Sequence, residues 1–185
     1  MFGERGLVDT RNVSDGDEFD LGDSGLPVHL SNSDRRVGVH RIVWATAATI
    51  DTAGNPSTRI LHPVWEWNGD GLTGWIATSP LSTKAKHLAN VPRVSLTYWH
   101  PSHDTCTAIC ATTWELSEEQ RREGWKRFAE APAPVGYDPS IVPGWDTPQA
   151  PAFGILRIDP ISLRVMDGSR TLGGAGRLLR WKATS

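Results

Sequence analysis

Cysteine is scarce in this chain of 185 residues, which has only Cys106 and Cys110. The residues around them alternate as in a β-strand, where positions four apart are separated by roughly 13 Å. A disulfide needs Cα atoms within about 7 Å of each other, so these two cysteines are not expected to pair. No cluster of cysteine and histidine has the spacing of a metal site. We therefore expect both thiols to be buried in the core.

Long apolar stretches and an excess of one charge are also missing. No apolar run approaches the roughly 20 residues of a membrane-spanning helix. The first 25 residues, with seven acidic side chains, contain no apolar secretion core. The net charge of −2, from 19 basic and 21 acidic residues, gives no reason to expect nucleic acid or a membrane surface as a partner. A cytoplasmic protein is the expectation.

The length suits one domain with a substantial core, but not two ordinary ones. Residues 1–33 are rich in Gly, Asp and Ser, and predict a flexible acidic N-terminal arm. Residues 34–167 predict the folded domain. Residues 168–185 are glycine-rich and then basic, and predict a flexible C-terminal tail.

Alternation of residue character along the domain predicts strands. Six strands are expected, at residues 42–49, 57–66, 72–78, 93–99, 105–116 and 153–166. Short turns rich in Gly, Asp and Asn join the first three strands, which is typical of an antiparallel meander. Pro63 indicates that the second strand lies at a sheet edge or contains a bulge, because proline cannot donate to the ladder.

Two segments predict helices. Residues 79–90 begin with Ser79 as the expected N-cap and a proline at the first helical position. Residues 117–129 begin with a Ser-x-x-Gln capping box. Residues 131–152 contain six prolines, which exclude regular structure and indicate a long loop. Together these elements predict a small antiparallel β-barrel with helical additions.

Hydroxyl-bearing and basic residues gather where the third predicted strand meets the first helix. Thr78, Ser82 and Thr83 offer hydroxyl groups there, while Lys84 and Arg59 offer positive charge. A helix N-terminus adds free N–H groups and the positive end of the helix dipole. This combination suits a phosphate dianion. An ordinary capped helix with a solvated lysine accounts for the same residue types, and the pattern alone leaves both open.

The order of several short motifs resembles the pyridoxamine-5′-phosphate-oxidase-like family of flavin-binding split barrels. The motifs are Trp44-Ala45-Thr46, Gly54-Asn55-Pro56-Ser57-Thr58-Arg59, Trp75-Ile76-Ala77-Thr78, Ser82-Thr83-Lys84 and Asn90-Val91-Pro92-Arg93-Val94-Ser95-Leu96. Residues 153–160 resemble the closing strand of that family, so the likeness covers roughly residues 34–165. It implies a mainly β fold, a six-stranded antiparallel split β-barrel with two or three helices, which binds FMN.

The resemblance also implies roles for individual residues. Arg59 and Lys84 match the cations that bind the cofactor phosphate, and Ser82 and Thr83 match its ligands at the helix start. The residues whose backbone would line the flavin ring and ribityl chain are Ile60, Leu61, Ala77 and Thr78. Cys106 falls where the family often has a glutamine near the ring. Because the family's site lies at a homodimer interface, a second copy of the chain is the implied partner.

Two departures from the family exclude pyridoxamine phosphate oxidation as the specific activity. Val64 stands where the true oxidase has a lysine, and residues 170–174 lack its Arg-x-His substrate signature. The resemblance thus implies an FMN-binding oxidoreductase for an unidentified small molecule, without an assignable catalytic side chain. A reductase that uses the deazaflavin coenzyme F-420 on the same fold is one alternative. A non-catalytic flavin-binding or stress-related module is the other.

Overall fold

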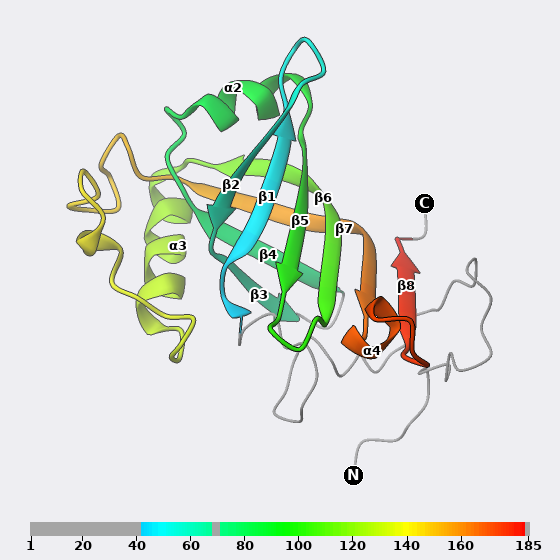
Figure 1. Ribbon diagram of the computed structural model, residues 1–185. Helices are drawn as coiled ribbons and strands as arrows, with labels where there is room; N and C mark the ends of the chain where they lie inside the picture. Colours follow the sequence, from blue (N-terminus) through cyan, green and yellow to red (C-terminus); the bar gives the residue numbers. More distant parts are fainter. Residues whose placement is uncertain (1–41, 68–70, 184–185) are drawn as a thin grey trace.

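The computed structural model describes residues 42–67 and 71–183, and the predicted N-terminal arm lies outside these ranges (Figure 1). The strands are β1 (Ala45–Ile50), β2 (Pro56–Leu61), β3 (Pro63–Trp67), β4 (Leu72–Ala77), β5 (Arg93–Trp99), β6 (Thr105–Glu115), β7 (Ile155–Met166) and β8 (Leu178–Lys182). The helices are α2 (Thr83–Asn90), α3 (Glu118–Glu130) and α4 (Gly168–Thr171), with the 3-10 turn η2 at Pro139–Ile141. The expected mainly β fold is confirmed. None of the helices in the described ranges is both long and apolar enough to cross a membrane.

All the strands belong to one antiparallel sheet, in the order β2-β1-β5-β6-β7-β4-β3, with β8 beside β7. Strand β7 is shared between two parts of this sheet. It pairs with β6 along its whole length, with β4 through Ile155–Ile158 and with β8 through Ser162–Met166. In Figure 1, α2 lies across the upper end of β1 and β2, and α3 lies beside the strands on the opposite side from β8.

The second predicted strand is two strands in the structure. His62 separates β2, which pairs with β1, from β3, which pairs with β4, and the two lie at opposite edges of the strand order. Pro63 is the first residue of β3. Proline has no N–H to donate to a neighbouring strand, and at this position β2 loses no hydrogen bond because of it. The expectation of an edge position at Pro63 is therefore confirmed, although residues 57–66 do not form one continuous strand.

The C-terminal segment differs from the flexible tail that its composition predicts. It forms α4 and β8, and Leu178 and Leu179 of β8 are buried with 7% and 2% exposure. The carboxylate of Asp167 accepts hydrogen bonds from the backbone N–H and from Nε of Arg177, both at 3.1 Å, which closes the connection to β8. A strand of five residues after a glycine-rich stretch is too short to produce a readable alternation, and pairing with β7 stabilises it.

Two apolar clusters form the core. The first fills the barrel and includes Ala47, Leu96, Cys106 and Cys110. Both thiols are free and at most 2% exposed, as expected, and burial raises the pKa of Cys106 to about 12. The second cluster lies between the sheet, α3 and the proline-rich loop, where the buried Phe128 of α3 is a central member.

Helix α3 is held at its start and along its buried face. The Ser117 hydroxyl accepts from the Gln120 N–H at 3.2 Å, and Oε1 of Gln120 accepts from the Ser117 N–H at 3.1 Å. This confirms the predicted capping box. Gly124 faces Ile155 of β7 so closely that a Cβ atom there would overlap the isoleucine side chain. The glycine therefore sets how near α3 approaches the sheet.

Candidate phosphate-binding site

Helix α2 begins three residues later than predicted. Ser82, not Ser79, is the N-cap, and Thr83 is the first helical residue. Ser79 instead closes a turn, because its hydroxyl accepts from the Leu81 N–H at 3.2 Å and its carbonyl accepts from Ser82 Oγ at 2.7 Å. Since Ser82 Oγ bonds backward, it makes no capping bond to the first turn of α2. The Ala85 N–H donates to the Ser82 carbonyl at 3.0 Å, which leaves the N–H groups of Thr83 and Lys84 available to an anion.

Lys84 turns back over this helix start. Its Nζ donates to Ser82 Oγ at 2.7 Å. Burial, reinforced by the positive charge of nearby Arg59, lowers the pKa of Lys84 to about 8. Burial also lowers the pKa of Arg59. The structure therefore brings Arg59 and Lys84, which are far apart in the chain, close enough for their charges to repel each other.

Arg59 is fixed by contacts with the neighbouring strand. It lies opposite Ala47 in the β1–β2 pairing. Its Nη1 donates to Thr49 Oγ1 at 2.7 Å and to the Ala47 carbonyl at 3.4 Å. Thr49 Oγ1 is also 3.0 Å from Nδ1 of His87, which belongs to α2. The two partners are buried, with exposed fractions of 2% for Thr49 and 8% for His87.

Sequence analysis did not single out Thr49 and His87. A signal for His87 was present, because it follows Lys84 by three residues and such residues share a helix face. Thr49 stands two residues after Ala47, on the same face of β1, and the side chain of Arg59 reaches it across the strand pair. That diagonal contact depends on the strand register, which the sequence pattern did not specify.

The other residues implied by the resemblance lie in different surroundings. Ile60 is 59% exposed on β2, while Leu61 packs against the barrel core. Thr78 is buried and its N–H donates to the Gly154 carbonyl at 2.9 Å. Thr83 is exposed at the start of α2. Ala77, at the end of β4, packs against the cluster under α3.

Cys106 is not brought to this site. It is enclosed in the barrel core at 2% exposure, between Tyr98 of β5 and Val165 of β7 in the sheet. A ligand on the surface would reach its thiol only by displacing core side chains. This placement does not support the expected contact between Cys106 and a flavin ring.

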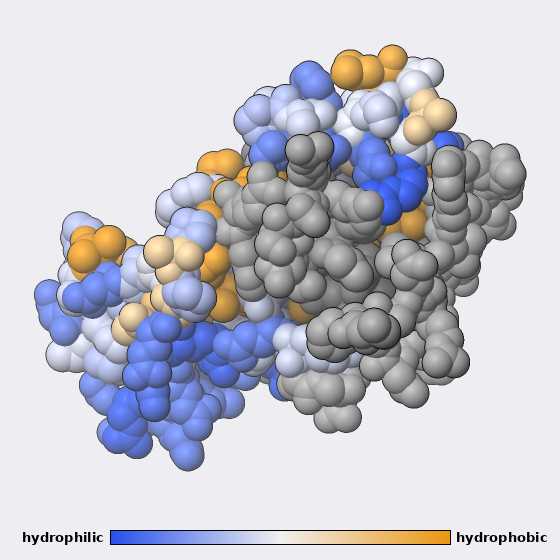
Figure 2. Space-filling view, turned by 90° about the horizontal axis from the view of Figure 1, so that it is seen from below, coloured by the Kyte–Doolittle hydropathy of each residue, from blue (hydrophilic) through white to orange (hydrophobic). Residues whose placement is uncertain are grey.

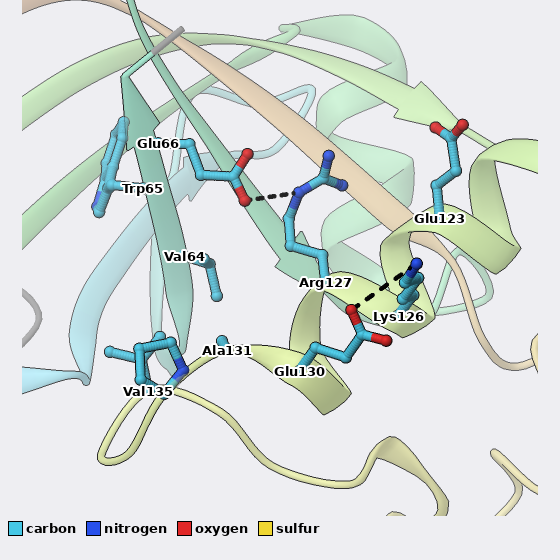
Figure 3. Close-up of a pocket in the computed structure, with 10 residues that line it drawn as sticks. Val64, Trp65, Glu66, Glu123, Lys126, Arg127, Glu130, Ala131 and Val135 are labelled. Atoms are coloured by element: carbon cyan, nitrogen blue, oxygen red, sulfur yellow. Dashed lines mark hydrogen bonds and ion pairs between the residues drawn. The ribbon is translucent and has the colours of Figure 1, made fainter.

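A separate cavity of about 620 Å³ lies between β3 and α3 (Figure 3). Four of its five charged side chains form two pairs: Arg127 Nε lies 3.0 Å from Glu66 Oε1, and Lys126 Nζ lies 3.9 Å from Glu130 Oε2. The Arg127 guanidinium also stacks over Trp75, 3.8 Å from the ring centroid. This cavity shares no residue with the cluster around Arg59, so the two are distinct features of the surface.

The chain forms a small antiparallel barrel with α2 across its end and α3 at its side, which is the arrangement of the split-barrel class of folds. A scan against family models found no match, and a search of curated proteins found none. Among solved structures, the chain is similar to a pyridoxamine 5′-phosphate oxidase-related, FMN-binding protein from Nostoc punctiforme. That likeness has 17% identity, a TM-score of 0.61, and covers 84% of this chain and 94% of the other.

Two further solved structures have the same fold. A protein related to general stress protein 26, of the pyridoxinephosphate oxidase family, from Clostridium acetobutylicum is 10% identical, with a TM-score of 0.59 over 78% of this chain and 88% of the other. A heme-binding protein from Mycobacterium smegmatis is 16% identical, with a TM-score of 0.50 over 77% of this chain and 56% of the other. The resemblance to the split barrels is thus confirmed for the fold. Solved structures with this fold are described as binding different ligands, FMN in one and heme in another. The function of this chain therefore has to be argued from its site.

Proposed function

We propose that this protein is an FMN-binding oxidoreductase whose cofactor phosphate is held by Arg59, Ser82 and Lys84. The observation that carries the proposal is the convergence of two partly buried cations at the uncapped start of α2. Two such cations repel each other, and a dianion between them removes that repulsion. The phosphate of FMN has the required charge and size, and backbone N–H groups and hydroxyls complete the set of donors.

The residues present fit FMN at its phosphate end. Lys84 Nζ is already turned toward the helix start, and Arg59 has Nε and Nη2 available beyond its two bonds from Nη1. Thr83 adds an exposed hydroxyl. The backbone of Ile60, Leu61, Ala77 and Thr78 would line the ring and ribityl chain, as the family resemblance implies. When bound, the flavin supplies the hydride chemistry, and the chain supplies position and electrostatics.

The proposal includes a homodimer with the cofactor at the subunit interface. The outer face of β2, β1, β5 and β6 has one uncharged row of paired residues, Ile60, Thr46, Thr97 and Thr107. Ile109 and Trp99 are also exposed, at 43% and 54%. Figure 2 shows apolar residues at the surface among hydrophilic ones on the face seen from below. These exposed apolar residues beside an uncharged row favour association with another protein surface.

Binding of FMN and of riboflavin to the purified protein tests the phosphate site. FMN should bind more tightly than riboflavin, which lacks only the phosphate. Replacement of Lys84 with alanine should weaken FMN binding by about 1.5–3 kcal/mol, the range for a charge-assisted hydrogen bond, and leave riboflavin binding unchanged. Lys86→Ala is the matched control, because Lys86 is exposed on the same helix. Equal affinity for FMN in wild type and Lys84→Ala would contradict the placement.

Reduction of the bound flavin tests the oxidoreductase assignment. NADH, NADPH or a reduced deazaflavin should bleach the flavin absorbance anaerobically at a rate that depends on donor concentration. If none of these donors reduces it, the protein is a flavin-binding module without this activity. A protein that remains colourless and binds only the deazaflavin coenzyme F-420 would replace FMN with that cofactor on the same phosphate site.

A further inference from the structure

We infer that Thr49 and His87 position Arg59 for the phosphate through a hydrogen-bond chain that links Arg59, Thr49 and His87. This inference rests on the proposed function and deepens it, since it assigns residues that act on the cofactor through its phosphate-binding cations and not by direct contact. All three side chains come from different elements, β2, β1 and α2. The chain therefore connects the arginine to the helix on which Lys84 stands.

Two hydrogen bonds at the Thr49 hydroxyl form the chain, and chemistry fixes the direction of the first. A guanidinium only donates, so Thr49 Oγ1 accepts from Arg59 Nη1 at 2.7 Å. The same hydroxyl keeps a proton and a second lone pair, and it bonds Nδ1 of His87, 3.0 Å away, as donor or acceptor according to the imidazole tautomer.

This arrangement leaves the useful part of Arg59 available. Both of its intramolecular bonds use Nη1, so Nε and Nη2 can present the two parallel donors that match phosphate oxygens. A free arginine would lose much rotamer freedom when it binds an anion. Because Thr49 and His87 are buried and pack between α2 and β1, they fix the guanidinium before the ligand arrives. Such preorganisation improves affinity by reducing the ordering cost of binding.

The same contacts explain why the two cations meet. His87 lies one helical turn after Lys84, so the bond between His87 and Thr49 fixes the rotation of α2 relative to β1. That rotation places Lys84 on the side where Arg59 lies. Without the chain, each cation would still be near the helix start, but their relative position would no longer be fixed for one phosphate.

Thr49→Val tests the chain, because valine keeps the shape of threonine and removes the hydroxyl. We expect FMN to bind about 2- to 10-fold more weakly, the equivalent of one net hydrogen bond, with riboflavin binding unchanged. His87→Leu should have the same selective effect. Thr49→Ser and His87→Asn, which keep a hydroxyl and an acceptor near Nδ1, should restore most of the FMN affinity.

A double-mutant cycle shows whether the effect passes through Arg59. In an Arg59→Ala background, Thr49→Val should change FMN affinity much less than in the wild type, because no guanidinium is left to position and only the placement of Lys84 by α2 is still affected. A full effect of Thr49→Val in that background, or an equal loss for riboflavin and FMN, would overturn the positioning role. If the wild type showed no preference for FMN over riboflavin, that result would contradict the proposed phosphate site and therefore also the positioning role.

Discussion

The affinity for FMN should fall as pH rises from about 7 to about 9, because Lys84 loses its proton over this interval. Burial and the charge of Arg59 lower the pKa of this lysine from 10.5 to about 8 in the free protein. Bound phosphate would stabilise the charged lysine and raise its pKa again. The phosphate itself is a dianion throughout, since its second pKa is about 6. Protonated Lys84 is therefore the binding-competent form, and it is lost above about pH 8.

The magnitude follows from the fraction of Lys84 that is protonated. With a pKa of about 8, roughly nine-tenths of the lysine is charged one pH unit below and roughly one-tenth one unit above. FMN affinity should then decrease about tenfold between these two values. Part of the side chain is exposed, and solvent screening makes this an upper value.

Equilibrium titration of FMN by flavin fluorescence, repeated along the pH series, measures this dependence. Riboflavin is the control ligand and should show no such decrease. Lys84→Arg should flatten the FMN profile, because a guanidinium stays charged up to about pH 12. Lys86→Ala should retain the wild-type profile. A flat profile for the wild type, or an unchanged decrease in Lys84→Arg, would refute the role of Lys84.

Three further predictions concern stability and are checked by urea unfolding. Ser117→Ala removes the capping box of α3 and should lower the free energy of unfolding by about 1 kcal/mol, with an unchanged m-value. Gly124→Ala places a methyl group against Ile155 and should cost about 1–3 kcal/mol; a neutral result would mean that α3 can move away from the sheet. Trp65→Phe leaves the buried Tyr98 hydroxyl without its 2.9 Å bond from the indole N–H and should cost about 1–3 kcal/mol.

Much of the fold could be predicted because the strands alternate clearly and are bounded by turn residues. The start of α2 could not be, since Ser79-Pro80 and Ser82 are both good helix starts by residue type. Only the turn closed by Ser79 decides between them. Strand β8 escaped prediction because its stability comes from pairing with β7 and not from its own pattern.

The candidate site divides in the same way. Arg59, Ser82 and Lys84 could be proposed as phosphate ligands because they occur in short motifs whose order resembles a known family. Thr49 and His87 could not, because their contact joins residues 38 apart and depends on how α2 packs on β1. The resemblance places Cys106 at a position near the flavin ring. In the structure, the alternation of side chains along β6 directs Cys106 toward the barrel core.

The shared strand β7 also has a consequence for how the chain folds. Its partners come from distant parts of the sequence, as in the pairing of Ile155 with Ala77 and of Met166 with Thr105. Bringing such segments together costs loop-closure entropy before the contacts repay it. Chains dominated by long-range pairing of this kind fold on the order of milliseconds to seconds. We therefore expect the docking of β7 to be a late step that joins the two parts of the sheet into one cooperative unit.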